Sequence, residues 1–262
     1  MFSKSFLAGL LLAITAVRAS PLQGGDGESH LKERDSSNLL DTSHSLGEIV
    51  RVKRDAALEP RDLELAEMHN VNLTMMYKHS IIKRDDGDHI TIWVDNGFEE
   101  NVGPKEGSLD KRQKAGLYRA AHFHDTPNDE CREHRRFDWT SKNAPTTGGI
   151  IALRQWAWDH YGAFGWGEAY GGSAWRNVLV AGSNAGTNAC YRARVDRWER
   201  HSVNVRIGTA DVAADADFTM SLARNYDGKW RASSYGYETC GGPGQGGTDM
   251  KYEVRRTDDP VY

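Results

Sequence analysis

The sequence has few cysteines, no long apolar run and none of the common hydrolase or nucleotide-binding motifs. Three cysteines occur in 262 residues, so one intrachain disulfide can form and one thiol is left over. No stretch of about 20 apolar residues is present, and we expect no transmembrane segment in the processed protein. Gly-x-Ser-x-Gly, Walker and Rossmann patterns are absent as well, and we therefore expect no cofactor.

Core-forming residues are concentrated after position 112. Residues 113–262 contain all three cysteines, seven of the eight tryptophans and 18 of the 27 glycines. They carry 19 basic against 18 acidic residues, a net charge of +1, whereas residues 20–112 carry 12 against 19, a net charge of −7. Nucleic-acid binders show a strong basic excess. We expect residues 113–262 to form the mature domain, with no nucleic-acid partner.

The first 19 residues have the three parts of a secretory signal peptide. Lys4 supplies a positive charge, residues 6–17 form an apolar run, and Val17 and Ala19 occupy the −3 and −1 positions. The pattern predicts cleavage after Ala19 and secretion to the extracellular space.

Residues 20–84 have a composition typical of a disordered pro-region. They are rich in Ser, Asp, Glu and Gly, and their apolar residues are scattered rather than periodic. One amphipathic piece, residues 58–77, favours a helix. Asn72, Leu73 and Thr74 form a glycosylation acceptor in a secreted chain.

Three dibasic pairs follow one another through this region. They are Lys53-Arg54, Lys83-Arg84 and Lys111-Arg112. A single pair is usually only solvated surface, but three pairs upstream of the compact part are typical of sites for a kexin-type protease. We expect cleavage after Arg54, Arg84 and Arg112, which leaves Gln113 as a new N-terminus.

The intermediate peptide 85–110 allows two interpretations. Residues 89–94 have strong β propensity and end at the turn pair Asn96-Gly97. The peptide is either a folding aid that is lost after cleavage, which we favour, or an extra strand that stays bound without a covalent link. It contains no cysteine, so no disulfide can hold it.

The periodicity of residues 113–262 predicts an α+β domain. We expect a short helix carrying Cys131 and His134, a helix from Ile150 to Phe164, and a second long helix beginning at Thr209. The expected strands are 175–181, 191–196 in a hairpin with 203–207, 230–239 and 250–254. The resulting fold has two helices packed on one face of an antiparallel sheet of about 4–6 strands, preceded by a largely disordered pro-region.

Several stretches of this domain resemble one fungal family. The stretches are Leu153…Trp156, Gly162–Gly167, Trp175…Leu179, Gly186…Cys190, Val205…Val212 and Gly236…Cys240. Together they are similar to the secreted necrosis-inducing effectors, whose wider relatives include fungal killer toxins. The resemblance covers residues 148–240 and implies a small secreted fold that acts on other organisms. It supplies no catalytic residues, and Thr147 and Gly148 stand where the family has a further cysteine.

The cysteines and histidines leave two questions open. Cys190 and Cys240 lie at opposite ends of expected strands and are the preferred disulfide, with Cys131–Cys240 as the alternative. The metal-like cluster is His122, His124, Cys131 and His134. These residues fit no established zinc spacing, and secreted cysteines generally oxidise. We therefore expect no metal site.

An enzymatic function has little support. The acidic residues that a cleft could use are Asp159, Glu168, Asp196 and Glu199. Scattered carboxylates on a soluble surface usually have no catalytic role, so we expect no catalytic residues and retain a small cell-wall-active hydrolase only as an alternative.

The most distinctive feature is an aromatic belt of seven residues. Its members are Trp156, Trp158, Tyr161, Phe164, Trp166, Tyr170 and Trp175. We expect Trp158 and Trp166 to be partly exposed and available for binding, and Trp156 and Trp175 to be buried. A possible second binding surface is the arginine series on the outer side of the expected hairpin: Arg192, Arg194, Arg197, Arg200 and Arg206.

Together these features predict a secreted, processed effector or toxin that acts by binding. The expected partner is a cell-surface or cell-wall component of a host or a competitor. An antifungal killer-toxin-like protein is the alternative within the same class.

Overall fold

The computed structural model describes residues 46–100, 129–167, 174–197, 204–241 and 247–259. Within these residues the chain forms three helices and thirteen strands. The helices are α1 (Pro60–Met68), α3 (Thr147–Asp159) and α4 (Thr209–Ser221). The strands are β1 (Ile49–Arg51), β2 (Met76–Ile82), β3 (Ile90–Asp95), β4 (Phe98–Glu100), β5 (Cys131–Asp138), β6 (Gly162–Gly167), β7 (Arg176–Gly182), β8 (Asn188–Arg197), β9 (Asn204–Gly208), β10 (Arg224–Tyr226), β11 (Lys229–Arg231), β12 (Ser234–Cys240) and β13 (Thr248–Arg256).

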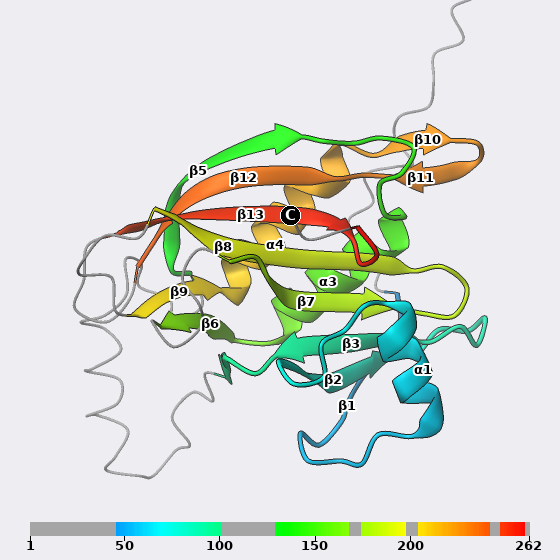
Figure 1. Ribbon diagram of the computed structural model, residues 1–262. Coiled ribbons are helices and arrows are strands. Elements are labelled where there is room, and N and C mark those ends of the chain that lie inside the picture. Colours follow the sequence, from blue (N-terminus) through cyan, green and yellow to red (C-terminus); the bar gives the residue numbers. More distant parts are fainter. Residues whose placement is uncertain (1–45, 101–128, 168–173, 198–203, 242–246, 260–262) are drawn as a thin grey trace, which may run out of the picture. The chain divides into compact units, whose positions relative to one another are not determined.

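Eight strands form one antiparallel sheet in the order β1-β2-β3-β7-β8-β13-β12-β5 (Figure 1). The expected sheet of 4–6 strands with two helices is therefore wrong, because the fold is dominated by a larger sheet. The missing strands come mainly from the N-terminal segment, which we define as residues 46–100. This segment supplies β1, β2 and β3, so the expectation of a largely disordered pro-region is wrong for these residues.

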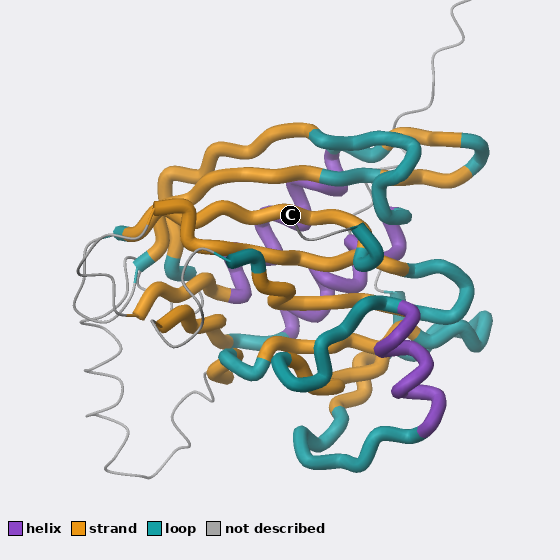
Figure 2. The backbone as a smooth tube through the Cα atoms, in the orientation of Figure 1, coloured by secondary structure: helices purple, strands orange, loops and turns teal. Residues whose placement is uncertain are grey.

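The two faces of the sheet are covered differently. Helices α3 and α4 pack on one face and lie behind the sheet in Figure 1, with Leu153, Trp156 and Val212 in the main core. Helix α1 lies on the other face, where Ala66 and Trp93 belong to a second, smaller cluster. Figure 2 shows that the helices are few and short beside the extended strands. The opposite face over β13, β12 and β5 has no helix among the described residues.

Two local predictions fail for the same reason, which is pairing between distant strands. Residues 131–138 form β5 against β12 instead of a short helix. Residues 204–208 form β9, which pairs with β6 in a separate three-stranded sheet and not with β8. The expected strand at 191–196 and the start of the helix at Thr209 agree with β8 and α4. The helix ends at Ser221, before the short β10–β11 hairpin.

The disulfide joins Cys131 to Cys240, the alternative pairing. The preferred pairing of Cys190 with Cys240 is wrong, because β13 lies between β8 and β12. Cys240 instead stands directly opposite Cys131 in the β12–β5 register. Cys190 is a buried free thiol in the small cluster under α1.

Candidate functional site

The open part of the sheet carries interleaved aromatic and charged side chains. On β8 and β13, Ala193, Val195, Met250 and Tyr252 belong to the core beneath α3 and α4. Because side chains alternate along a strand, their neighbours point to the opposite side. We call this surface the sheet face. Its residues are Arg135, Phe137, Trp139, Trp175, Arg192, Arg194, Tyr235, Tyr237, Lys251, Glu253 and Arg255.

Aromatic rings form the centre of the sheet face. Phe137 stacks on Tyr235, its cross-strand partner, with ring centroids 5.0 Å apart. Trp139 meets the edge of Tyr235 at 5.9 Å, and Tyr237 meets the edge of Phe137 at 6.3 Å. Phe137 and Trp139 keep 42% and 48% of their surface exposed. Exposed rings held by a rigid sheet bury large areas on binding at little entropic cost.

Cationic side chains lie over these rings. The Lys251 ammonium is 5.4–5.7 Å from the ring centroids of Trp175, Tyr235 and Tyr237. The guanidinium groups of Arg192 and Arg194 lie 4.8 Å and 5.1 Å from the centroid of Trp175. Each contact is within the range of a cation–π interaction. The aromatic and basic residues therefore form one continuous surface.

Carboxylates pair with three of the five cationic residues of the sheet face. Arg192 donates to Glu253 from Nε at 2.7 Å, and Arg255 donates to the same carboxylate at 3.2 Å. Arg194 lies 3.5 Å from Asp196. Arg192 is only 3% exposed. Arg192, Arg194 and Arg255 are thus held by carboxylates, whereas Arg135 and Lys251 lie over aromatic rings.

The four predicted binding residues do not form one surface. Trp158 is 49% exposed on α3, on the helical side of the sheet, whereas Arg192 and Arg194 belong to the sheet face. Trp166 is 2% exposed, so its predicted exposure is wrong. It lies in β6 between β4 and β9 instead of at a helix end. Trp156 is buried as expected, but Trp175 is half-buried.

The remaining members of the sequence-based sets lie apart. Arg206 pairs with Glu99 away from the sheet face. Asp159 is exposed on α3, and Asp196 lies at the edge of the sheet face, so the structure does not bring these acids together. Tyr170, Glu168, Glu199, Arg200, His122 and His124 lie outside the described residues, as does the side chain of Arg197.

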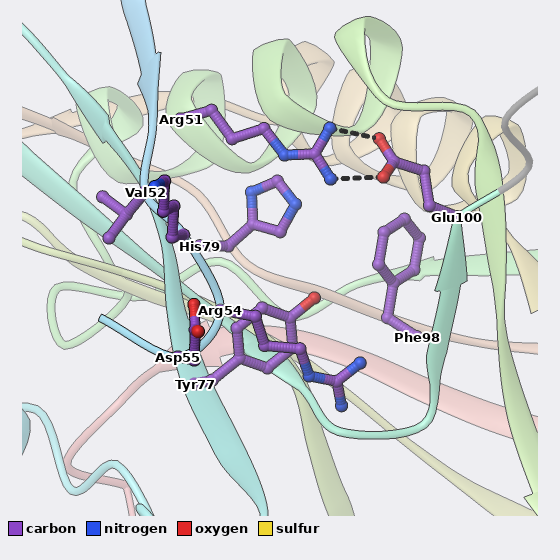
Figure 3. Close-up of a pocket in the computed structure, with 9 residues that line it drawn as sticks. Arg51, Val52, Arg54, Asp55, Tyr77, His79, Phe98 and Glu100 are labelled. Atoms are coloured by element: carbon purple, nitrogen blue, oxygen red, sulfur yellow. Dashed lines mark hydrogen bonds and ion pairs between the residues drawn. The ribbon is translucent and has the colours of Figure 1, made fainter. Parts of the chain in front are cut away.

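A separate cavity of about 370 Å³ lies within the N-terminal segment. Figure 3 shows Tyr77, His79 and Phe98 on its walls, with Arg51 and Glu100 facing each other as an ion pair. Its lining residues all fall between positions 51 and 100.

The side chains that line this cavity are engaged in packing and hydrogen bonds with the rest of the protein. Trp156 Nε1 donates to His79 Nδ1 at 3.2 Å. Burial and the neighbouring His160 lower the pKa of His79 to about 3, so the ring is a poor base at neutral pH. The wall also contains Lys53 and Arg54, one of the expected cleavage sites. We therefore do not assign the ligand site to this cavity.

A carboxylate cluster lies between α4, β5 and β12. Arg136 Nε donates to Asp215 Oδ1 at 2.8 Å, and the Tyr191 hydroxyl donates to Asp215 Oδ2 at 2.9 Å. His134 Nδ1 is 3.1 Å from Glu238 Oε2. Burial, and then the charge of Asp215, raise the pKa of Glu238 well above its ordinary value.

His134, Asp215 and Glu238 are candidate metal ligands by proximity, since their donor atoms lie within 4.8 Å of one another. Arg136 and Tyr191 already contact both oxygens of Asp215, and the guanidinium opposes a cation there. Cys131 from the sequence-based metal cluster is in the disulfide. We assign the carboxylate cluster the role of joining α4 to the sheet.

The expected processing and modification sites lie on the surface where they are described. Residues 53–57, which include the Lys53-Arg54 pair, are exposed in the connection between β1 and α1. Lys83-Arg84 lies in the connection between β2 and β3. The Asn72 side chain is exposed, and its Oδ1 accepts a hydrogen bond from the Thr74 hydroxyl at 2.7 Å. Lys111-Arg112 and Ala19 lie outside the described residues.

No protein-family model matches the chain, and no curated protein is detectably similar to it in sequence. Membership of the effector family stays a hypothesis that rests on the resembling stretches. In the described part of the chain, no helix has the length and apolarity needed to cross a bilayer.

Proposed function

We propose that the protein is a secreted effector- or toxin-like protein that binds a carbohydrate on the surface or in the wall of a host or competitor cell. The observation that carries this proposal is the ring cluster of Phe137, Trp139, Tyr235 and Tyr237 on the sheet, in which Phe137 and Trp139 are exposed. Signal-peptide and dibasic patterns in the sequence support secretion and processing.

The chemistry of the sheet face favours a sugar over other ligands. A sugar ring has an apolar C–H face and a rim of hydroxyl groups, so it fits a flat surface on which rings alternate with hydrogen-bonding groups. Phe137 and Trp139 offer the rings, and the half-buried Lys251 and Tyr237 lie beside them with groups that can form hydrogen bonds. Glu253 and Arg255 are buried and pair with each other. Pairing of Arg192, Arg194 and Arg255 with carboxylates weakens the attraction of this face for nucleic acid or an anionic membrane.

Binding is favoured over catalysis by the placement of the acids. Asp215 and Glu238 are completely buried, and the exposed Asp159 lies on the other side of the sheet. Hydrolysis of a glycosidic bond needs two carboxyl groups about 5–10 Å apart on either side of the substrate. Glu253, within the ring cluster, is buried and accepts from Arg192 and Arg255. The exposed Glu133 and Asp249 both contact the Thr239 hydroxyl, beyond the ring cluster on β12. A wall-active hydrolase is therefore the weaker candidate.

Two exposed tryptophans offer a matched test. Trp139 and Trp158 are 48% and 49% exposed, but only Trp139 belongs to the sheet face. Secreted wild-type protein, Trp139→Ala and Trp158→Ala are incubated with insoluble chitin, β-1,3-glucan and mannan, and the bound fraction is measured. We expect Trp139→Ala to weaken binding about 10-fold or more, which corresponds to about 1.4 kcal/mol, and Trp158→Ala to bind like the wild type.

The outcomes separate the candidate surfaces and the two function classes. Loss of binding in Trp158→Ala alone would place the ligand on the α3 side. Equal binding by all three proteins would exclude the sheet face. Release of soluble sugars from the polymers by the wild type would favour the hydrolase.

A further inference from the structure

We infer that the peptides 55–84 and 85–112 remain bound to residues 113–262 as non-covalent subunits after cleavage at the dibasic pairs. This inference rests on the proposed processing. It also reverses the preference drawn from sequence, in which the peptide 85–110 is a folding aid that is lost. The evidence is the set of contacts that cross the expected cleavage sites.

Backbone pairing is the first of these contacts. Strand β3 lies inside the sheet, hydrogen-bonded to β2 on one side and to β7 on the other, with register pairs from Thr91↔Gly182 to Val94↔Leu179. Strand β4 pairs with β6 in the small sheet. Loss of peptide 85–112 would expose the whole edge of β7, a hazard for aggregation that secreted proteins avoid.

Burial of β3 on both faces is the second contact. Ile90, Ile92 and Val94 belong to the main core, and Trp93 belongs to the cluster under α1; each is 0% exposed. Strand β3 is thus enclosed between the core under α3 and the cluster under α1. Its departure would open both hydrophobic clusters at once.

Buried polar contacts form the third group. Asp95 of β3 makes a two-pronged ion pair with Arg176 of β7, and both side chains are buried. Asp88 accepts a hydrogen bond from the Ser183 hydroxyl at 2.6 Å. Removing one partner of a buried ion pair leaves an uncompensated charge, which is strongly unfavourable. Release of the peptide would leave Arg176 in that state beside Trp166.

Peptide 55–84 is held through α1 and β2. Strand β2 pairs with β3, and Ala66 of α1 packs on the cluster that contains Val180 and Cys190. His69 Nε2 lies 3.0 Å from the Ser183 carbonyl oxygen. These contacts reach residues of the mature domain directly, so peptide 55–84 does not depend on peptide 85–112 alone.

The described cleavage sites lie between paired elements rather than within them. The Lys53-Arg54 pair lies between β1 and α1, and Lys83-Arg84 follows β2. Cutting there leaves β2 and β3 whole, and separates only the edge strand β1 from the retained pieces. All three cysteines lie after position 112, so no disulfide links the pieces, and a denaturant without reductant separates them.

The secreted protein is examined by size-exclusion chromatography and native mass spectrometry, and then by mass spectrometry in guanidinium without reductant. We expect peptides beginning at Asp55 and Asp85 to co-elute with the domain beginning at Gln113 in equal amounts, and to separate only in denaturant. A soluble, folded domain 113–262 that elutes without them would overturn the inference.

A second variant makes the test independent of natural processing. Each dibasic pair is replaced by the recognition sequence of a site-specific protease, and the folded, purified chain is cut in vitro. Retention of the pieces supports the inference, and their dissociation contradicts it. A wild-type chain secreted uncut would contradict only the proposed processing.

The Asp95–Arg176 ion pair supplies a selective weakening. In the cut protein, Asp95→Asn should raise the fraction of peptide 85–112 lost on dilution at least 10-fold, because Arg176 loses its buried counter-charge. Asp86→Asn is the matched control, since Asp86 is exposed in the same peptide and its ion pair is with Arg84 of peptide 55–84, not with residues of the domain 113–262. Equal retention by both variants would show that the ion pair does not hold the peptide.

Discussion

Glu130 is a buried acid whose protonation depends on folding. Its side chain is 0% exposed just before β5, and its backbone N–H donates to Asp211 Oδ2 at 2.9 Å. Burial raises the pKa of Glu130 to about 8 from its ordinary value of 4.5, while the nearby Arg206 opposes the change. The folded protein therefore keeps this proton over a pH range in which the unfolded chain has lost it.

The resulting pH dependence has a definite sign. Because the folded state binds more protons, the free energy of unfolding falls as pH rises from about 4.5 to about 8. Glu130→Gln removes this contribution and should stabilise the protein by about 3–5 kcal/mol at pH 8.5 relative to its effect at pH 4.5, because the pKa is raised from 4.5 to about 8 and each pKa unit corresponds to about 1.4 kcal/mol.

Denaturant unfolding at the two pH values measures the difference. Glu133→Gln, at an exposed position of β5, is the control and should show no such pH-dependent gain. A Glu130→Gln variant with the wild-type pH profile would contradict a protonated Glu130.

The third cysteine, Cys190, should not react with thiol reagents in the folded protein. Cys190 is 2% exposed under α1, and burial raises the pKa of its thiol to about 12. Since the thiolate is the reactive form, we expect the native protein to show no titratable thiol with a maleimide reagent. One thiol per chain should react in guanidinium. A covalent dimer that disappears on reduction would contradict this placement.

At the scale of elements, local patterns predicted some strands and failed where glycine permits close packing. The alternation of residues 191–196 correctly predicts β8. The glycine-rich residues 162–167 suggest a helix end but form β6. A Cβ at Gly162 would lie 2.5 Å from the Glu99 carbonyl oxygen and 2.7 Å from the Phe98 ring. Glycine at position 162 therefore allows β4 to pack directly against β6. The need for glycine here comes from β4, which is distant in sequence, so no local pattern reveals it.

The sequence indicates which residues of the sheet face share one side of a strand, but not which strands lie next to each other. Arg135, Phe137 and Trp139 alternate with other residues, as do Tyr235 and Tyr237, and this period of two indicates one face of a strand. Residues 131–138 nevertheless follow residues 126–130, whose Thr, Pro and acidic residues are typical of a helix start. This pattern led to the expectation of a short helix. That Phe137 meets Tyr235 depends on the β12–β5 pairing across about 100 residues of sequence, and no local signal contains it.

At the scale of the whole molecule, three histidines lie where the N-terminal segment meets the rest of the protein. His69 follows α1 and contacts Ser183; His79 of β2 packs against Trp156 and against His160, which follows α3. Burial lowers the pKa of all three, that of His79 to about 3. Arg51 and Arg54 near His79 act in the same direction, whereas Asp88 and Asp258 near His69 oppose it.

Acid should therefore loosen the attachment of the N-terminal segment. Below pH 6.5 these histidines bind protons when the N-terminal segment is separated or unfolded, but not when they are buried in the folded protein. The free energy of unfolding therefore falls as pH falls from about 6.5 towards 3. The buried carboxyls, such as Glu130, act in the opposite direction, and a single histidine variant is needed to isolate the effect.

The variant His79→Gln provides that isolation. Between pH 7 and pH 5, its free energy of unfolding should fall by about 1–2 kcal/mol less than that of the wild type. The reason is that glutamine takes up no proton on unfolding, whereas His79 does. His89→Gln, in the loop after Arg84, is the control. Denaturant unfolding of the uncut chain gives the free energies.

In the cut protein, size-exclusion chromatography at pH 7 and pH 5 should show that His79→Gln retains the peptides better on acidification. If acid releases the peptides from His79→Gln as readily as from His89→Gln, protonation of His79 does not control the attachment of the N-terminal segment.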